Sequence, residues 1–225
     1  MLTGNGFVTV GRCEINADAR VCAGAVIGKP FRPLLDAVAE PETVGATVIR
    51  ADAYIGYFAV VGAGSVLSEG VIVDDYCCIE SDVNIGERSL VIYRSQICNE
   101  ARVGRGCVIG GFIAERVVVG DGVRVFGKIV HRHHDPSAGW DAPASAEPSA
   151  TVEPGAFIGF DALVVGGVVI GQMAYVCAGA IVTRDVPARH IAFGVNKVVP
   201  FNEWKGGLAR STFFSNRHAS GTSNA

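Results

Sequence analysis

An aliphatic residue returns at every sixth position along most of the chain. The four registers run from Ile15 to Ile27, from Ile49 to Ile109, from Ile113 to Val125 and from Val152 to Val182, and all 23 positions hold Ile, Val or Leu. Within the registers, the fourth residue after each of these is never larger than Val. A period of six fits neither the 3.6-residue turn of a helix nor a single alternating strand. It predicts a coil of short strands with a corner every six residues.

Three strands and three corners make one coil, so the hexads predict about seven to eight triangular coils. Paired strands lie roughly 4.8 Å apart, which gives a rod about 35 Å long. Glycine follows many of the aliphatic residues, as at Gly56 and Gly104, and adopts corner conformations at low cost. We therefore expect an all-β fold, a parallel β-helix over residues 1–200, with a short C-terminal extension at 201–225 whose last residues are mobile.

The register breaks at three places. Residues 29–47 form a Pro-flanked insertion with a single helical turn expected at 34–38, and residues 127–151 form a second, His-rich insertion. Between Ile109 and Ile113 the register slips by two residues, which we interpret as a bulge. After Val182 the alternation is lost, and we expect Pro187 to end the coil. Insertions in a repeat protein are where binding elements usually lie.

Composition and charge narrow the function classes. The hydrophobic fraction of 49% excludes a disordered chain, and the net charge of −3 gives no basic excess for nucleic acid or an anionic membrane. The N-terminal segment does not have the pattern of a secretory leader, so we expect a cytoplasmic protein. Seven cysteines without a CxxC pair predict neither a disulfide framework nor a structural zinc site. Cys13, Cys77 and Cys107 fall on the small-residue position, which indicates packing.

The sequence HRHHD in the second insertion holds the candidate chemistry. His131, His133 and His134 have side chains whose ordinary pKa suits a general base near neutral pH. The alternative is structural: His131 falls on the next hexad position after Val125 and would cap the interior, while His133 and His134 would be solvated. Both interpretations remain open from the residues alone.

The hexads, the insertion and the closing coils together resemble the hexapeptide-repeat acyltransferases, in particular the acetyl-CoA-dependent enzymes that modify small molecules. The resemblance implies a left-handed β-helix and a homotrimer with active sites between subunits. It implies that His134, followed by Asp135 and Pro136, is the general base, with His131 as second choice because Arg132 follows it directly. His133, Asp135 and Trp140 are then expected to contact the acceptor.

The same resemblance assigns a site for the acyl-CoA donor. The family motif A-G-[AS]-x-V-T-[KR]-D matches Ala178, Gly179, Ala180, Thr183, Arg184 and Asp185. Backbone groups at the Ala and Thr positions are implied to bind the pantetheine amides, Arg184 the nucleotide phosphates, and Phe160 the thiol end. The family exit motif G-x-P-A-[KR] is replaced by Gly194-Val195-Asn196-Lys197, so the contact of Lys197 with the 3′-phosphate rests on a changed motif.

The predicted function is acyl transfer from acetyl-CoA to an amine or hydroxyl of a small polar acceptor such as an amino sugar. No G-x-S-x-G motif is present, which favours direct attack on the thioester over a covalent acyl-enzyme. No metal is expected. Two alternatives remain: a zinc-dependent hydratase like a carbonic anhydrase, because one branch of the fold binds zinc through three histidines, and a non-catalytic scaffold. The acceptor and the choice between N- and O-transfer are not readable from the sequence.

Overall fold

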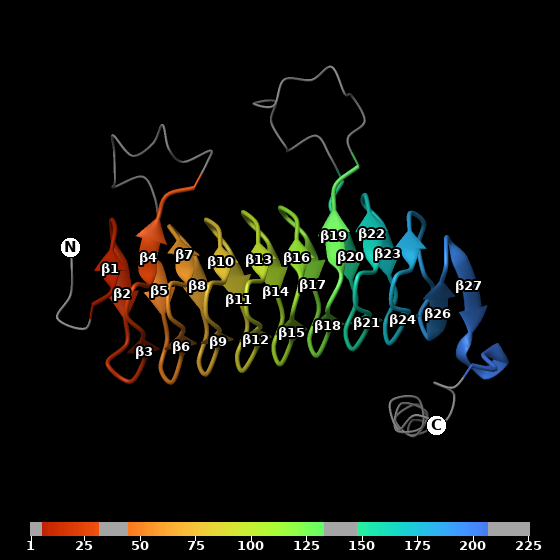
Figure 1. Cartoon of the computed structure of the whole chain (residues 1–225), viewed down its shortest axis with the longest axis horizontal. Coiled ribbons are helices and arrows are strands. Elements are labelled where there is room, and N and C mark those ends of the chain that lie inside the picture. Colours follow the sequence, from red (N-terminus) through yellow and green to blue (C-terminus); the bar gives the residue numbers. More distant parts are fainter. Residues whose placement is uncertain (1–5, 32–44, 133–147, 207–225) are drawn as a thin grey trace, which may run out of the picture.

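The computed structural model describes residues 6–31, 45–132 and 148–206, and within these ranges 27 short strands wind into one long coil (Figure 1). The strands form three sheets, here called A, B and C. From β1 to β25, successive strands belong to A, then B, then C, so each strand pairs with the strand three places further on. The fold is a left-handed parallel β-helix. The hexads predict the β-helix, and the family resemblance predicts its handedness.

The strand bounds follow the hexads closely. Sheet A contains β1 (Val8–Thr9), β4 (Val26–Lys29), β7 (Val60–Gly62), β10 (Cys78–Ile79), β13 (Gln96–Ile97), β16 (Phe112–Ile113), β19 (Lys128–Val130), β22 (Leu163–Val165) and β25 (Ile181–Val182). Sheet B contains β2 (Cys13–Ile15), β5 (Thr47–Ile49), β8 (Val66–Leu67), β11 (Asn84–Ile85), β14 (Arg102–Val103), β17 (Val118–Val119), β20 (Thr151–Val152) and β23 (Val169–Ile170). Sheet C contains β3 (Arg20–Val21), β6 (Tyr54–Ile55), β9 (Ile72–Val73), β12 (Leu90–Val91), β15 (Val108–Ile109), β18 (Arg124–Val125), β21 (Phe157–Ile158), β24 (Tyr175–Val176), β26 (His190–Phe193) and β27 (Lys197–Pro200).

The core is a single column of aliphatic side chains inside the triangle. Ile55, Val61 and Leu67, one from each sheet, have no exposed surface, and the same holds for most hexad positions after them. The small position beside each corner is also buried, and Thr47 occupies it at the start of β5, where its hydroxyl donates to the carbonyl of Gly62 at 3.2 Å. The aliphatic residue at every sixth position and the small residue four positions later therefore both fill the interior of the same triangular cross-section, which repeats along the rod.

Two shortened corners replace the predicted bulge. From Ile109 in β15 to Ile113 in β16, and from Val125 in β18 to Ile129 in β19, the next core residue comes after four positions. The pairing of β13 with β16 stays in regular register, so no bulge is present there. The shortening brings Gly111 against the backbone of Gly127, where a Cβ atom on Gly111 would collide with the Gly127 carbonyl. Only glycine fits this corner.

The second shortened corner also corrects the prediction for His131. The hexad count places His131 at a core position, but the structure fills that position with Ile129, which is fully buried in β19. The chain therefore leaves the rod after Val130 rather than at residue 127. His131 lies at the root of the insertion, half-buried, and does not cap the interior.

The coil continues beyond Val182, contrary to the prediction. A third shortened corner leads to Val186, which is buried and bridges to Ile170 of sheet B. β26 then pairs in parallel with β24, with Ala192 as its core residue, and β27 folds back antiparallel on β26 to close the end of sheet C. With these strands the helix has eight to nine coils. The extension after residue 200 begins with a 3-10 turn, Phe201–Glu203.

Both insertions leave the rod at the same edge, between sheets A and B. The first connects β4 to β5, and the second connects β19 to β20, with the first near the N-terminal end and the second closer to the C-terminal end (Figure 1). The helical turn expected at residues 34–38 lies outside the described residues. The edge between A and B is therefore the part of the rod that carries the elements most suited to binding.

Candidate donor and acceptor site

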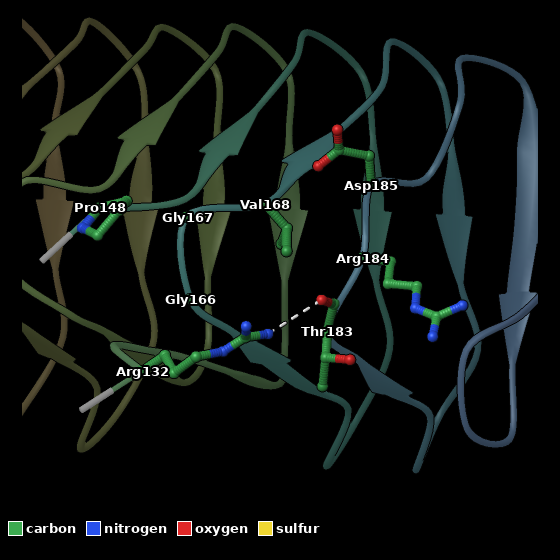
Figure 2. A pocket seen from close by; sticks show the side chains of 8 residues that line it. All are labelled: Arg132, Pro148, Gly166, Gly167, Val168, Thr183, Arg184 and Asp185. Carbon is green, nitrogen blue, oxygen red and sulfur yellow. Dashed lines mark hydrogen bonds between the residues drawn. The ribbon is translucent and has the colours of Figure 1, made fainter. Parts of the chain in front are cut away.

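A hollow of about 370 Å³ lies at the root of the second insertion, on the edge between sheets A and B. Arg132, the last described residue before the insertion, and Pro148, the first after it, form one wall (Figure 2). The corner after β22 and the corner after β25 form the rest, so the lining is Arg132, Pro148, Gly166, Gly167, Val168, Thr183, Arg184 and Asp185. The hollow joins the start and end of the insertion to the closing coils.

One hydrogen bond connects the root of the insertion to the last coil. Nη2 of Arg132 donates to the carbonyl oxygen of Thr183 at 3.2 Å, across 51 positions of sequence (Figure 2). Arg132 is exposed, so this contact lies at the mouth of the hollow. A guanidinium offers five donors, and only one of them is used in this bond. Arg132 therefore has donors left for a ligand in the hollow.

Two glycines shape the floor of the hollow. A Cβ atom on Gly167 would collide with the ring of Pro148, and one on Gly166 would press on the side chain of Arg132 at 3.3 Å. Gly166 also has a φ of +86°, a conformation that residues with a side chain rarely adopt. Because Gly166 and Gly167 have no side chains, both ends of the insertion can approach the corner after β22 closely.

Thr183 is held from both sides. Its N–H donates to Oδ1 of Asn196 at 2.8 Å, and Nδ2 of Asn196 donates to the Thr183 hydroxyl at 2.8 Å. The carbonyl of Thr183 accepts from Arg132. The neighbouring Asp185 accepts from the N–H of Val169 at 2.8 Å, which fixes this corner to the previous coil. The corner after β25 is therefore rigidly built.

The structure places the predicted donor residues on two edges of the same closing coil. Ala178, Gly179 and Ala180 form the corner between sheets C and A, whereas Thr183 and Arg184 form the corner between A and B. β25 joins the two corners across sheet A, and its outward residue Ile181 is 38% exposed. These residues form a band across one face rather than a single pocket.

Phe160 lies at the start of this band. Its side chain is 63% exposed and stacks on Phe126 with ring centroids 4.6 Å apart. Its carbonyl accepts from the N–H of Gly179 at 2.9 Å, which ties it to the donor motif. Phe126 also contacts Phe157, which in turn stacks on Tyr175. The band thus begins at an aromatic surface and ends at Arg184. Lys197, in β27, is exposed and lies beyond Gly194 on the hairpin that follows.

Of the predicted histidines, only His131 lies within the described residues. Its Nε2 atom is buried at the root of the insertion. One coil earlier, Glu115 occupies the equivalent place on the same edge, because Ile113 and Ile129 are register partners. His133, His134, Asp135 and Trp140 lie outside the described residues.

The edge ahead of the insertion holds a connected polar network. Glu80 accepts from Gln96 Nε2 at 2.8 Å and from the N–H of Asn99, and Asn99 donates through Nδ2 to Glu115 at 3.3 Å. Asn99 is only 6% exposed. Burial, together with the negative charges of Glu80 and Glu115, raises the pKa of the Cys98 thiol well above its usual range. Cys98 therefore stays a protonated thiol at neutral pH and is not a nucleophile.

Two cysteines in the rod interior resemble Cys98 in this respect. Burial raises the pKa of Cys77 to about 11 and raises the pKa of Cys107, both in the small position beside a corner. All seven cysteines are free thiols. Among the described residues, no three His, Cys, Asp or Glu side chains are grouped as a metal site, and no helix is long and apolar enough to cross a bilayer.

Sequence reasoning missed Arg132 and Asn196 as site residues. Arg132 entered only as the residue after His131, and Asn196 only as a departure from the exit motif. The available signal for Asn196 was its place in the exit motif. Nothing in the local sequence predicts the hydrogen bond between Arg132 and Thr183, because the two residues come together only when the coils stack.

Comparison with known proteins adds the family. No family model matches the chain. The bifunctional protein GlmU of Brevibacillus brevis is 30% identical over 176 residues, covering 68% of this chain and 36% of that protein. GlmU of Geobacillus thermodenitrificans is 31% identical over 182 residues, covering 66% of this chain and 39% of that protein. The chain belongs to the hexapeptide-repeat acyltransferase family.

The membership covers only part of the relatives. The chain spans less than two fifths of the length of these two GlmU proteins. Among solved structures, the UDP-N-acetylglucosamine acyltransferase of Campylobacter jejuni aligns with a TM-score of 0.49 at 15% identity, covering 96% of this chain and 81% of that one.

Proposed function

We propose that the chain transfers an acyl group, most simply acetyl, from acyl-CoA to an amine or hydroxyl of a small polar acceptor such as an amino sugar. The observation that carries the proposal is the band of family donor residues across the closing coil, which ends beside the hollow at the root of the His-bearing insertion. Acyl transfer needs the acceptor beside the thioester. The band meets the hollow at Thr183 and Arg184, the end proposed for the nucleotide, so we propose that the insertion beside the thioester belongs to a neighbouring subunit of the trimer.

The donor fits the band by its chemistry. The thioester end lies at Phe160 and Ala178, and the arm crosses sheet A over Ile181, whose exposed side chain gives an apolar contact. The anionic nucleotide end reaches Arg184, which is exposed. Lys197, in the hairpin that follows, is a second exposed cation. The acceptor is proposed to bind between the insertion of one subunit and the thioester end of the donor on its neighbour.

The reaction proceeds by direct attack. A histidine of the insertion, His134 or His131, takes the proton from the acceptor amine or hydroxyl as its nitrogen or oxygen bonds to the thioester carbon. The tetrahedral intermediate collapses with cleavage of the carbon–sulfur bond, and the proton passes to the departing CoA thiolate. The backbone N–H of Ala178 is a candidate for stabilising the oxyanion, since the N–H of Gly179 already donates to the Phe160 carbonyl. His133, Asp135 and Trp140 are proposed to contact the acceptor.

The proposed assembly is a homotrimer in a reducing, cytoplasmic setting. Outward positions of sheet A include Val26, Val60 and Leu163, and Ile72 on sheet C is 43% exposed. An apolar outer face of this kind is typical of a surface covered by another subunit. Light scattering at micromolar concentration tests this: we expect three times the 23.5 kDa of one chain, and a monomer contradicts it.

Calorimetry with acetyl-CoA on the metal-free protein tests the function. We expect binding in the micromolar range without added zinc. Absence of binding at millimolar acetyl-CoA, or binding that returns only when zinc is restored, contradicts acyl transfer and favours the hydratase or the scaffold. The control ligand is free acetate, which lacks the arm and the nucleotide.

A further inference from the structure

The side chain of Arg132 lies along the wall of the hollow at the root of the second insertion. It passes over Gly166, where an added Cβ atom would lie 3.3 Å from the Arg132 Cβ and 3.5 Å from its Nε. Its Nη2 donates to the Thr183 carbonyl oxygen at 3.2 Å. Because β19 pairs with β22, and β22 with β25, Arg132 crosses a whole coil to reach Thr183 (Figure 2). The guanidinium is therefore held at the mouth of the hollow.

The Thr183 carbonyl is open to Arg132 because the previous corner has no donor for it. At a regular corner, the carbonyl after the core residue accepts from the small side chain one coil earlier, as Gly62 accepts from the Thr47 hydroxyl at 3.2 Å. In the corner before Thr183 the small position is Val168, which has no side-chain donor. The bond to Thr183 anchors Arg132 and uses one of the five guanidinium donors.

The lining of the hollow carries more positive than negative charge. Arg132 and Arg184 are both exposed, and within the described residues neither forms an ion pair. The one carboxylate of the lining, Asp185, accepts from the N–H of Val169 on the previous coil at 2.8 Å. Two guanidinium groups beside a single carboxylate attract an anionic ligand.

A phosphate-bearing ligand fits this hollow. The planar fork of a guanidinium offers parallel N–H donors to two phosphate oxygens. The volume of about 370 Å³ lies in the range of sites for small organic molecules, so there is room for more than a free ion. The proposed donor carries its phosphates on the nucleotide end, and the donor band enters the hollow at Thr183 and Arg184. The hollow thus lies where these phosphates arrive.

We infer that Arg132 is a donor-binding residue, which holds the phosphates of the nucleotide end together with Arg184. The inference rests on the proposed acyl-CoA donor. The sequence motif gives this contact to Arg184 and gives none to Arg132, whose place is set only by the stacking of the coils. The root of the insertion then binds the donor of its own subunit, whereas the insertion beside that donor's thioester is proposed to come from a neighbour.

Calorimetry tests the inference with acetyl-CoA and with adenosine 3′,5′-bisphosphate, which has phosphates but no arm. Arg132→Gln should weaken acetyl-CoA binding about three- to tenfold, the effect of an exposed charge-assisted contact. The affinity for the bisphosphate, measured by competition with acetyl-CoA, should fall by the same factor. Both losses should shrink at high salt, because screening already weakens the contact in the wild type.

Two further variants separate phosphate binding from a structural role. Arg132→Lys loses the fork but keeps the charge, so its affinity for both ligands should lie between wild type and Arg132→Gln. Arg102→Gln is the matched control: it removes an exposed guanidinium from the outer face of sheet B and should leave both affinities unchanged. A loss in Arg102→Gln as large as in Arg132→Gln would be a general effect of charge and overturns the inference.

The remaining outcomes are equally distinct. Unchanged acetyl-CoA affinity in Arg132→Gln overturns the inference, as does a loss for acetyl-CoA without a loss for the bisphosphate. Equal losses in Arg132→Lys and Arg132→Gln assign Arg132 a purely structural role and also overturn it. Wild-type protein that does not bind acetyl-CoA instead overturns the proposed function.

Discussion

The edge between sheets A and B is built differently in the middle coils and in the closing coils. In the middle, Glu80, Asn99 and Glu115 bond to one another from coil to coil, and Asn99 is buried. At the closing end, the corner after β25 is shortened, and Arg132 and Thr183 line a hollow instead. The same repeat thus gives an edge with hydrogen bonds between coils where the coils stack regularly. It gives a hollow where a shortened corner lies beside an insertion.

The difference shows how a solenoid separates stability from binding. Every core residue contacts only its neighbouring coils, so a local change at one end leaves the rest of the rod unaltered. The insertion and the shortened corner are placed together, and that combination creates the hollow. The predictions below change one region at a time.

The largest effect is expected from the histidines at the open end. His134→Ala should lower kcat by roughly 10²–10⁴, the usual contribution of general acid–base catalysis, with the trimer and its Tm unchanged. Steady-state kinetics with acetyl-CoA measure this. If His131→Ala loses activity while His134→Ala keeps it, the base is His131. Activity retained in both variants refutes a catalytic role for the insertion.

A core substitution in the middle coils should lower the stability of the protein and leave acetyl-CoA binding unchanged. Ile97 in β13 is fully buried, and Ile97→Ala should destabilise the protein by about 2–5 kcal/mol through lost burial and the cavity left behind. Denaturant unfolding gives the free energy. Acetyl-CoA affinity of the folded variant should match wild type, and a large change in affinity would show that the two regions are coupled.

Arg184→Ala should have a smaller effect confined to the donor. We expect acetyl-CoA binding to weaken by about 1–2 kcal/mol at low salt and by less at high salt, because an exposed cation contributes a screened, charge-assisted contact. Calorimetry at two salt concentrations measures both values. The matched variant is Ala178→Trp, which should block the arm sterically at either salt concentration. Equal salt dependence in the two variants would contradict these assignments.

The sequence predicts the fold far better than the site, and the corners show why. Ile97 and the other hexad positions are determined by a local period, so they are readable directly. Ile129 and Val186 follow shortened corners, where the period changes from six to four without a composition signal, and the predicted register fails there. The bond of Arg132 to Thr183 joins residues 51 positions apart and depends on how the coils stack.

The smallest effect on stability is expected for a substitution on the edge between sheets B and C. Asp121 accepts from the backbone N–H and the side chain of Arg105, and these bonds lower the pKa of Asp121. A lowered folded pKa means that the stabilisation is present above the unfolded pKa and is lost as pH falls through the folded value. Asp121→Asn should therefore lower Tm slightly at neutral pH and not at strongly acidic pH. A pH-independent change in Tm would contradict this.

A crystal structure of the protein soaked with acetyl-CoA tests the central claim most directly. We expect the arm across sheet A on the closing coil, with the thioester beside Phe160 and Ala178 and the nucleotide end near Arg184. Donor bound on the middle coils, or on the edge at Glu80 and Asn99, would contradict it.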